Sequence, residues 1–125
     1  MVAAAVRKFP GACGPGEEYF LAPEKLLQGN PRQTAWVLYT DPSGHFTAGL
    51  WHSERGRWKI SYTEEEYCQM LEGVSVITDQ AGTAVTMRAG EEFVIPAGFT
   101  GTWEVVEPTR KRFVIYEPGT APPGG

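Results

Sequence analysis

Apolar and polar residues alternate over short stretches along most of this chain, and turn-forming residues separate the stretches. Between residues 58 and 63, for example, tryptophan, isoleucine and tyrosine alternate with lysine, serine and threonine. A period of two is typical of a β-strand with one buried face. The pattern recurs in about nine strands, with turn signals every eight to twelve residues. The predicted strands cover residues 35–39, 45–52, 58–63, 66–71, 74–78, 83–87, 93–95, 102–106 and 113–116.

Only one short segment carries the signals of a helix. Pro23 opens it and Gly29 follows it, which predicts a helix of one or two turns over residues 23–28. We expect residues 1–33 to form an N-terminal arm that includes this helix, residues 34–117 to form the β domain, and residues 118–125 to be a flexible tail. The chain is therefore predicted to be a single-domain, all-β protein folded as a sandwich or jelly-roll barrel, because closure hides strand edges.

Composition narrows the range of partners. A chain of 125 residues suffices for one domain with a sizeable core. The net charge of −4 argues against nucleic acid or an anionic membrane as the main partner, and the basic run at residues 110–112 is too short to reverse this.

Apolar runs, the N-terminal residues and the cysteines indicate where in the cell the protein is located. No apolar run reaches the ~20 residues of a membrane span, and the first apolar residues precede the charges, the reverse of a secretory signal. The two cysteines, Cys13 and Cys68, do not make a disulfide framework. We expect a cytoplasmic protein with reduced thiols.

Two glycine-bearing segments carry a more specific pattern. Glu66 precedes Gly73 by seven positions, and Gly90 is followed at motif spacing by Pro96 and Gly98. Together with further residues around them, these segments resemble the cupin family, and within it the cupin domain of ureidoglycine aminohydrolase. The resemblance spans roughly residues 49–116 and implies a double-stranded β-helix, the jelly-roll barrel of cupins. The further matching residues are Trp51, Leu71-Glu72, Phe93-Val94-Ile95, Trp103-Glu104-Val105 and Glu107-Pro108-Thr109-Arg110-Lys111.

The resemblance also implies where a metal would be held. Metal-binding cupins use a His-x-His pair, a glutamate and a later histidine. Glu66 matches the glutamate, whereas the later histidine position falls on Gly101. The His-x-His positions hold Ile60 and Tyr62 or, with a loop one residue longer, Lys59 and Ser61.

Three of the four ligands are therefore missing, and we expect no metal and no other cofactor. A transition-metal site usually needs three or more protein ligands. The sequence contains two histidines, His45 and His52. A site made by His52 with Glu66 is the remaining metal alternative, against an ordinary histidine on an edge strand.

An aromatic pocket is the predicted binding site. If Glu66 points inward, alternation places Cys68 and Met70 on the same face. Mostly apolar walls with a few polar groups are typical of small-molecule pockets, although the same aromatic side chains could simply fill the barrel as core. The predicted ligand is a small molecule, with anions among the candidates. The predicted ligand-binding residues are Trp51, Trp58, Cys68, Trp103 and Lys111.

Two interpretations of Glu66 stay open. A carboxylate among aromatic side chains must be paired, hydrogen-bonded or protonated, because burying a bare charge is costly. It could act with Tyr62 as a catalytic acid–base pair. It could instead form a structural ion pair with a basic side chain, for which the candidates are Lys111, Arg110 and Lys59.

Three classes of function follow. The first is a non-metal cupin barrel that binds a small-molecule metabolite around one carboxylate. The second is an isomerase or aminohydrolase that uses Glu66 and Tyr62 for proton transfer. The namesake aminohydrolase activity relies on a manganese site, for which this sequence lacks the histidines, and we do not transfer it. The third is a structural module, since cupins commonly form homodimers through edge strands or an exchanged N-terminal segment. The resemblance therefore implies that this chain forms a homodimer.

Overall fold

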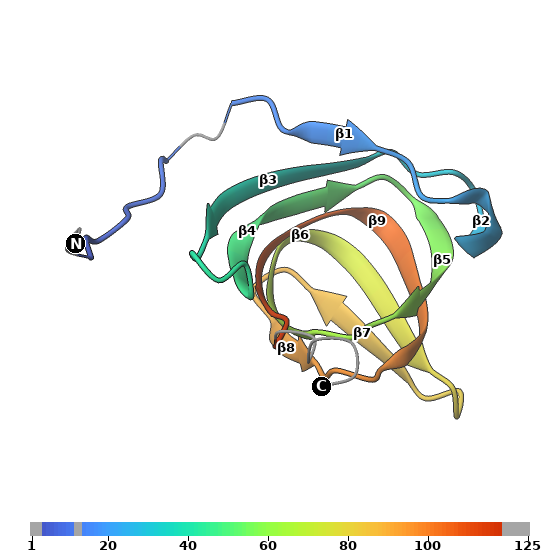
Figure 1. The fold of residues 1–125 in the computed structure, drawn as a ribbon. Coiled ribbons are helices and arrows are strands. Elements are labelled where there is room, and N and C mark those ends of the chain that lie inside the picture. The colour runs from blue at the N-terminus through green and yellow to red at the C-terminus, as the bar shows by residue number, and fades with distance from the viewer. Residues whose placement is uncertain (1–3, 12–13, 119–125) are drawn as a thin grey trace.

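The computed structural model describes residues 4–11 and 14–118 as an all-β fold whose sheet curls into a barrel (Figure 1). The predicted all-β jelly-roll architecture is confirmed. A single turn of 3-10 helix, η1 (Pro23–Lys25), interrupts the strands of the described residues. The strands are β1 (Glu17–Tyr19), β2 (Leu26–Gln28), β3 (Gln33–Thr40), β4 (Phe46–Ser53), β5 (Gly56–Ser61), β6 (Glu65–Asp79), β7 (Ala84–Arg88), β8 (Glu92–Ile95) and β9 (Thr100–Tyr116).

Two long antiparallel strands, β6 and β9, connect the two sides of the barrel. The first half of β6 pairs with the second half of β9, and the second half of β6 pairs with the first half of β9. On one side of the barrel these halves lie between β8 and the series β4, β3, β1. On the other side they lie between β7 and the series β5, β2. The barrel is thus two sheets that share their central strands.

A corner at Gly73 lets β6 pass from one sheet to the other. Gly73 has φ of +87°, and a Cβ built on it would lie 2.1 Å from the carbonyl oxygen of Pro108 on β9. Only glycine combines this backbone conformation with so close an approach. The pairing of β6 with β9 shifts register around this point. As a result, Glu66, Cys68 and Met70 are buried before the corner, whereas odd-numbered residues are buried after it.

The strand boundaries differ from the prediction in two ways. Residues 66–71 and 74–78, predicted as two strands, belong to the single strand β6, and residues 102–106 and 113–116 belong to β9. The turn signals between them mark bends and bulges, because the ladder continues through these positions.

The N-terminal segment also differs from the prediction. The predicted helix over residues 23–28 is shortened to η1, because Leu26 and Gln28 pair with β5. β1 pairs with β3, so residues assigned to the arm extend both sheets at their edges. Cys13 and residues 119–125 of the predicted tail lie outside the described residues. Within residues 4–11 and 14–118, we find no helix long and apolar enough to cross a membrane.

The interior of the barrel is rich in aromatic side chains. The rings of Trp58 and Trp103 stack with an interplanar angle of 6°, and Trp51 meets both of them edge-on. Trp58, as predicted, shares the inward face of β5 with Ile60. The buried cluster comprises Trp51, Trp58, Ile60, Ile77, Ile95, Trp103, Val105 and Phe113.

Candidate functional site

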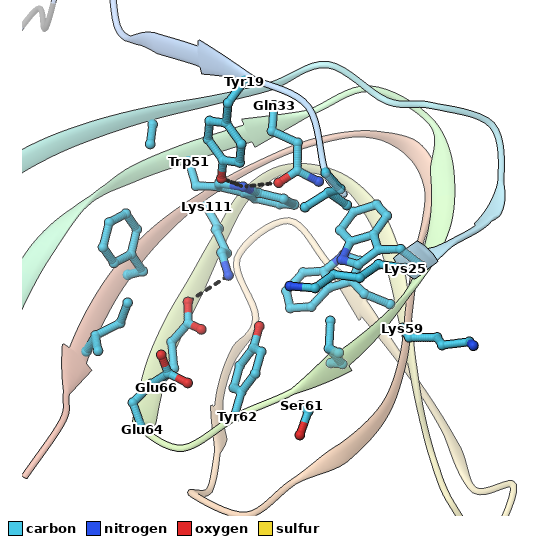
Figure 2. A pocket seen from close by; sticks show the side chains of 17 residues that line it. Tyr19, Lys25, Gln33, Trp51, Lys59, Ser61, Tyr62, Glu64, Glu66 and Lys111 are labelled. Atoms are coloured by element: carbon cyan, nitrogen blue, oxygen red, sulfur yellow. Dashed lines mark hydrogen bonds and ion pairs between the residues drawn. The ribbon is translucent and has the colours of Figure 1, made fainter. Parts of the chain in front are cut away.

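A cavity of about 290 Å³ lies inside the barrel, lined by side chains from β1, η1, β3, β4, β5, β6 and β9 (Figure 2). Its volume is near the lower end of the range of ~300–1,000 Å³ found for small-molecule sites. Aromatic and aliphatic side chains form most of its wall. The polar and charged groups among the lining residues include Tyr19, Lys25, Gln33, Tyr62, Glu64, Glu66 and Lys111.

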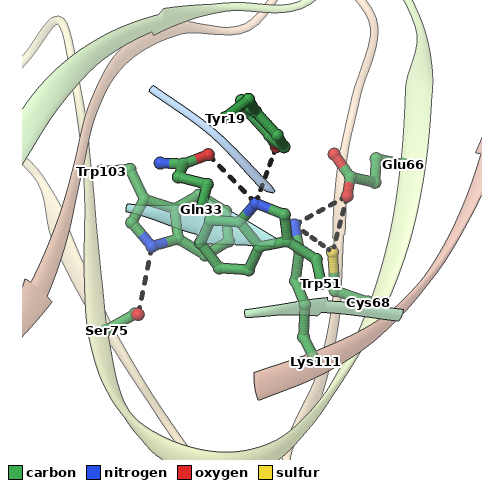
Figure 3. A network of polar contacts seen from close by, with 8 residues as sticks. All are labelled: Tyr19, Gln33, Trp51, Glu66, Cys68, Ser75, Trp103 and Lys111. Atoms are coloured by element: carbon green, nitrogen blue, oxygen red, sulfur yellow. Dashed lines mark hydrogen bonds and ion pairs between the residues drawn. The ribbon is translucent and has the colours of Figure 1, made fainter. Parts of the chain in front are cut away.

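An ion pair between Glu66 and Lys111 is built into the wall of this cavity. The ammonium nitrogen of Lys111 lies 2.7 Å from Oε2 of Glu66, and the two residues are only 4% and 5% exposed. Lys111 also donates to Sγ of Cys68 at 3.5 Å, and the Cys68 thiol donates to the same Glu66 oxygen at 3.4 Å (Figure 3). Of the three predicted partners of Glu66, the structure therefore selects Lys111.

Aromatic rings hold the Lys111 ammonium from the other side. Its nitrogen lies 4.8 Å from the ring centroid of Trp51 and 4.4 Å from that of Trp103. A desolvated ammonium over an indole face gains cation–π stabilisation of roughly 2 kcal/mol. Two rings and one carboxylate thus replace the water that Lys111 loses on burial.

These surroundings set the protonation states around the ion pair. Burial alone would lower the pKa of Lys111, but the neighbouring Glu66, Cys68 and Tyr62 together outweigh burial and raise that pKa above its usual value. Burial raises the pKa of the Cys68 thiol to about 12. Burial, reinforced by the charge of Glu66, raises the pKa of the Tyr62 hydroxyl. At neutral pH, Lys111 is therefore charged, whereas Cys68 and Tyr62 are neutral hydrogen-bond donors.

A second polar group surrounds the indole N–H of Trp51 (Figure 3). This N–H donates to Oε1 of Gln33 at 3.1 Å and to the hydroxyl of Tyr19 at 3.2 Å. Tyr19 and Gln33 lie opposite each other on β1 and β3, and Ala35 pairs with Trp51 across β3 and β4. Gln33 is 3% exposed, and its Nε2 has no hydrogen-bond partner among the described residues.

The indole N–H of Trp103 has a purely structural partner. It donates to Oγ of Ser75 at 3.1 Å, and the Ser75 hydroxyl contacts that of Thr109 at 2.8 Å. Ser75 and Thr109 are both fully buried, on β6 and β9 respectively. Trp103 is thus fixed in place, and only its ring faces the cavity.

Most of the predicted site residues meet at the cavity. The lining contains the two predicted catalytic residues, Glu66 and Tyr62, and four predicted ligand-binding residues: Trp51, Trp58, Trp103 and Lys111. Cys68 is not in the lining. It is 0% exposed and lies behind the ion pair, where it contacts Glu66 and Lys111.

The sequence interpretation missed Tyr19 and Gln33, because both fell in the predicted arm. A signal was available for Gln33, since extending the alternation of β3 backwards from Ala35 puts Gln33 on the same face. No local pattern indicates Tyr19, because it reaches the site only through the pairing of β1 with β3.

The residues present do not fit the metal of metal-binding cupins. The histidine positions hold Gly101 and either Ile60 and Tyr62 or Lys59 and Ser61, and a fixed ammonium already neutralises Glu66. His52 follows Trp51 on β4 and lies with Trp36 and Arg110 in a separate surface hollow, so the structure does not bring His52 and Glu66 together. Across residues 4–11 and 14–118, no group of three or more His, Cys, Asp or Glu side chains is arranged to hold a metal ion.

Solved structures share this fold. The EutQ protein of Clostridium difficile matches with 20% identity and a TM-score of 0.63, over 70% of this chain and 64% of that chain. A DUF861-family protein from Pseudomonas syringae matches with 19% identity and a TM-score of 0.72, over 81% of this chain and 43% of that chain. A putative ethanolamine utilization protein Q from Salmonella typhimurium matches with 17% identity and a TM-score of 0.62, over 83% of this chain and 98% of that chain.

At these identities the likeness establishes the fold alone. A comparison with curated proteins gave no match. The resemblance to the cupin domain of ureidoglycine aminohydrolase stays a prediction, whereas membership of the cupin superfamily is confirmed. The family model of the EutQ-like cupin domain matches residues 40–113, which run from the last residue of β3 into the second half of β9. The chain therefore belongs to the family of EutQ-like cupin domains.

Proposed function

We propose that this protein binds a small-molecule metabolite inside its barrel, in the cavity beside the Glu66–Lys111 ion pair. The site uses no metal, because the cation next to the carboxylate is the Lys111 ammonium. The aromatic walls supply apolar contact area, and the few polar groups orient the ligand.

The observation that carries this proposal is the unpartnered amide of Gln33 at the wall of a cavity. A core that only filled the barrel would leave neither a cavity of about 290 Å³ nor a buried side-chain donor without an acceptor. Leaving such a group unsatisfied costs about 1–3 kcal/mol. A bound molecule that supplies an acceptor removes this cost.

A thermal-shift screen with a library of central metabolites tests the proposal. A ligand at one hundred times its Kd stabilises the native state by about 2.7 kcal/mol, which raises the Tm on the order of 10 °C in a domain of this size. Since Trp51, Trp58 and Trp103 line the cavity, the same ligand should change the intrinsic fluorescence.

Two variants on β3 locate the binding site. Ala35 lines the cavity, so Ala35→Phe should fill it and abolish the shift. Val37 is 61% exposed on the same strand, and Val37→Phe should leave the shift unchanged. A library without any stabilising compound, or a shift that Ala35→Phe leaves intact, would refute the proposal.

Proton-transfer catalysis is the second candidate, because Glu66 and the Tyr62 hydroxyl line the same cavity. The raised pKa of Tyr62 keeps its hydroxyl protonated, so Tyr62 would hold a reacting group by donating a hydrogen bond. If a ligand found in the screen is turned over, Tyr62→Phe should lower kcat and leave the thermal shift largely in place. A homodimer and a cytoplasmic location stay predictions from the sequence.

A further inference from the structure

The orientation of the Gln33 side chain determines what its end of the cavity can bind. The indole N–H of Trp51 can only donate a hydrogen bond, so the atom of Gln33 that faces it must be the oxygen. The amide nitrogen is then directed away from Trp51, where it has no partner among the described residues although Gln33 is 97% buried. Gln33 lines the cavity, and its enclosed amide nitrogen requires an acceptor.

Tyr19 adds a second donor at the same end. Its hydroxyl oxygen accepts from Trp51, so its own proton is free for another acceptor. Burial raises the pKa of Tyr19, which keeps the hydroxyl protonated. Lys25 of η1 brings an ammonium to the cavity wall (Figure 2), and no ion pair of Lys25 is seen among residues 4–11 and 14–118.

The opposite end of the cavity offers acceptors. Oε2 of Glu66 receives the bonds from Lys111 and Cys68, and the Tyr62 hydroxyl approaches the same carboxylate, which leaves acceptor capacity on Oε1. Figure 2 shows Glu64 beside Glu66 at this end, away from Tyr19 and Gln33. Uncharged donors therefore lie toward one end of the cavity, and two carboxylates together with the Lys111 ammonium lie at the other.

Building on the proposed binding function, we infer that the ligand is a small monocarboxylic acid with a hydroxyl or amino group at its far end. Gln33 and Tyr19 donate to its carboxylate, Lys25 supplies the countercharge, and Oε1 of Glu66 accepts from its hydroxyl or amino group. The small volume of the cavity limits the ligand to the size of a single ring or a short chain.

Two matched series of compounds test this inference by titration calorimetry and Trp fluorescence on the whole protein. The first consists of 4-hydroxybutyrate, 4-aminobutyrate, butyrate and 4-hydroxybutyramide. The second consists of 4-hydroxybenzoate, 4-aminobenzoate, benzoate and 4-hydroxybenzamide. In at least one series the hydroxy or amino acid should bind at least tenfold more tightly than both the amide, which lacks the charge, and the parent acid, which lacks the far donor. The tighter binder of the hydroxy acid and the amino acid identifies the group from which Glu66 accepts a hydrogen bond.

Three variants assign the contacts. Gln33→Glu keeps an acceptor for Trp51 but removes the free donor, and should weaken binding of the acid at least tenfold. Tyr19→Phe removes one hydroxyl at the edge of the site and should weaken binding several-fold even if Gln33→Glu folds poorly. Lys25→Met should weaken binding of the acid and leave binding of the amide unchanged. Arg57→Met, an exposed position on β5 outside the cavity lining, is the control for loss of a positive charge.

The two proposals fail separately. The metabolite screen can find neutral ligands whose thermal shift is abolished by Ala35→Phe, while no acid of either series binds more tightly than its amide. In that case binding in the cavity stands and the inference of a carboxylic acid ligand is wrong. The acid inference is also wrong if both Gln33→Glu and Tyr19→Phe fold and bind the acid as the wild type does. If no compound of any kind responds to Ala35→Phe, the cavity is not a binding site.

Discussion

Removing the Lys111 ammonium should destabilise the fold strongly. In Lys111→Met the aliphatic stem and its packing are largely kept, whereas Glu66, 5% exposed, loses its counter-ion at 2.7 Å. Breaking a buried ion pair by removing one partner costs about 3–5 kcal/mol, because the other charge is left uncompensated. Since domains are stable by about 5–15 kcal/mol, the variant should still fold measurably.

Urea denaturation followed by Trp fluorescence measures this loss. With an m-value of about 2 kcal/mol/M, the urea midpoint of Lys111→Met should fall by roughly 1.5–2.5 M. Lys59→Met, at an exposed position of β5, should change stability by less than about 0.5 kcal/mol. The double variant Lys111→Met/Glu66→Gln should recover part of the loss, because no bare charge remains.

The pH dependence gives an independent check. The pKa of Lys111 is raised in the folded state. Its contribution to the free energy of unfolding is therefore fully present below the unfolded pKa of about 10.4 and declines only as pH rises beyond that value. The difference between wild type and Lys111→Met should therefore not shrink from pH 7 to 9. A loss below 1 kcal/mol, or a difference that already shrinks between pH 7 and 9, would show that the pair is not desolvated as the structure has it.

Three further variants test the corner of β6, the buried thiol and the hydrogen bonds behind the cavity. Gly73→Ala should lower the free energy of unfolding, measured by urea denaturation, much more than Gly82→Ala does. Gly82 has a similar positive φ but open space around it, so its replacement should cost only about 1–2 kcal/mol. Equal losses in the two variants would contradict the close approach of Gly73 to β9. In a Cys13→Ser background, Cys68 should resist iodoacetamide at pH 8 until urea unfolds the protein, and rapid labelling of the native protein would contradict its burial. Because the pKa of Cys68 is raised to about 12, the free energy of unfolding that the thiol contributes is complete below the unfolded pKa of about 8.5 and is lost as pH rises toward 12. Ser75→Ala should cost about 1–3 kcal/mol by calorimetric unfolding, since it leaves a buried indole N–H without an acceptor, and a neutral result would mean that another acceptor replaces it.

The proposals agree with the family but go beyond what it shows. Membership of the EutQ-like cupin domain family establishes the barrel, and neighbours at 17–20% identity add no activity. In the barrel of this chain, an ammonium lies over two indole rings and next to the Glu66 carboxylate. The nature of the ligand therefore has to be read from these side chains.

The sequence by itself determined the fold class and which side chains share a face of a strand. Side-chain direction in a strand depends on local alternation, so the sequence could place Trp58 with Ile60, and Glu66 with Cys68, on one face of a strand each. That these faces point into the barrel is seen only in the structure. The lack of histidines at the ligand positions of metal-binding cupins was equally visible in the sequence, because motif spacing is also a local property.

Only the tertiary structure decided the rest, because it depends on which strands become neighbours. The chain continues through Gly73 as one strand since β9 pairs with β6 on both sides of that corner, and this pairing also reverses the buried parity of β6. The same is true of the site: Lys111 meets Glu66 from 45 positions away, and Trp51 orients Gln33 across 18. Such contacts follow from the register between strands, which no pattern of neighbouring residues encodes.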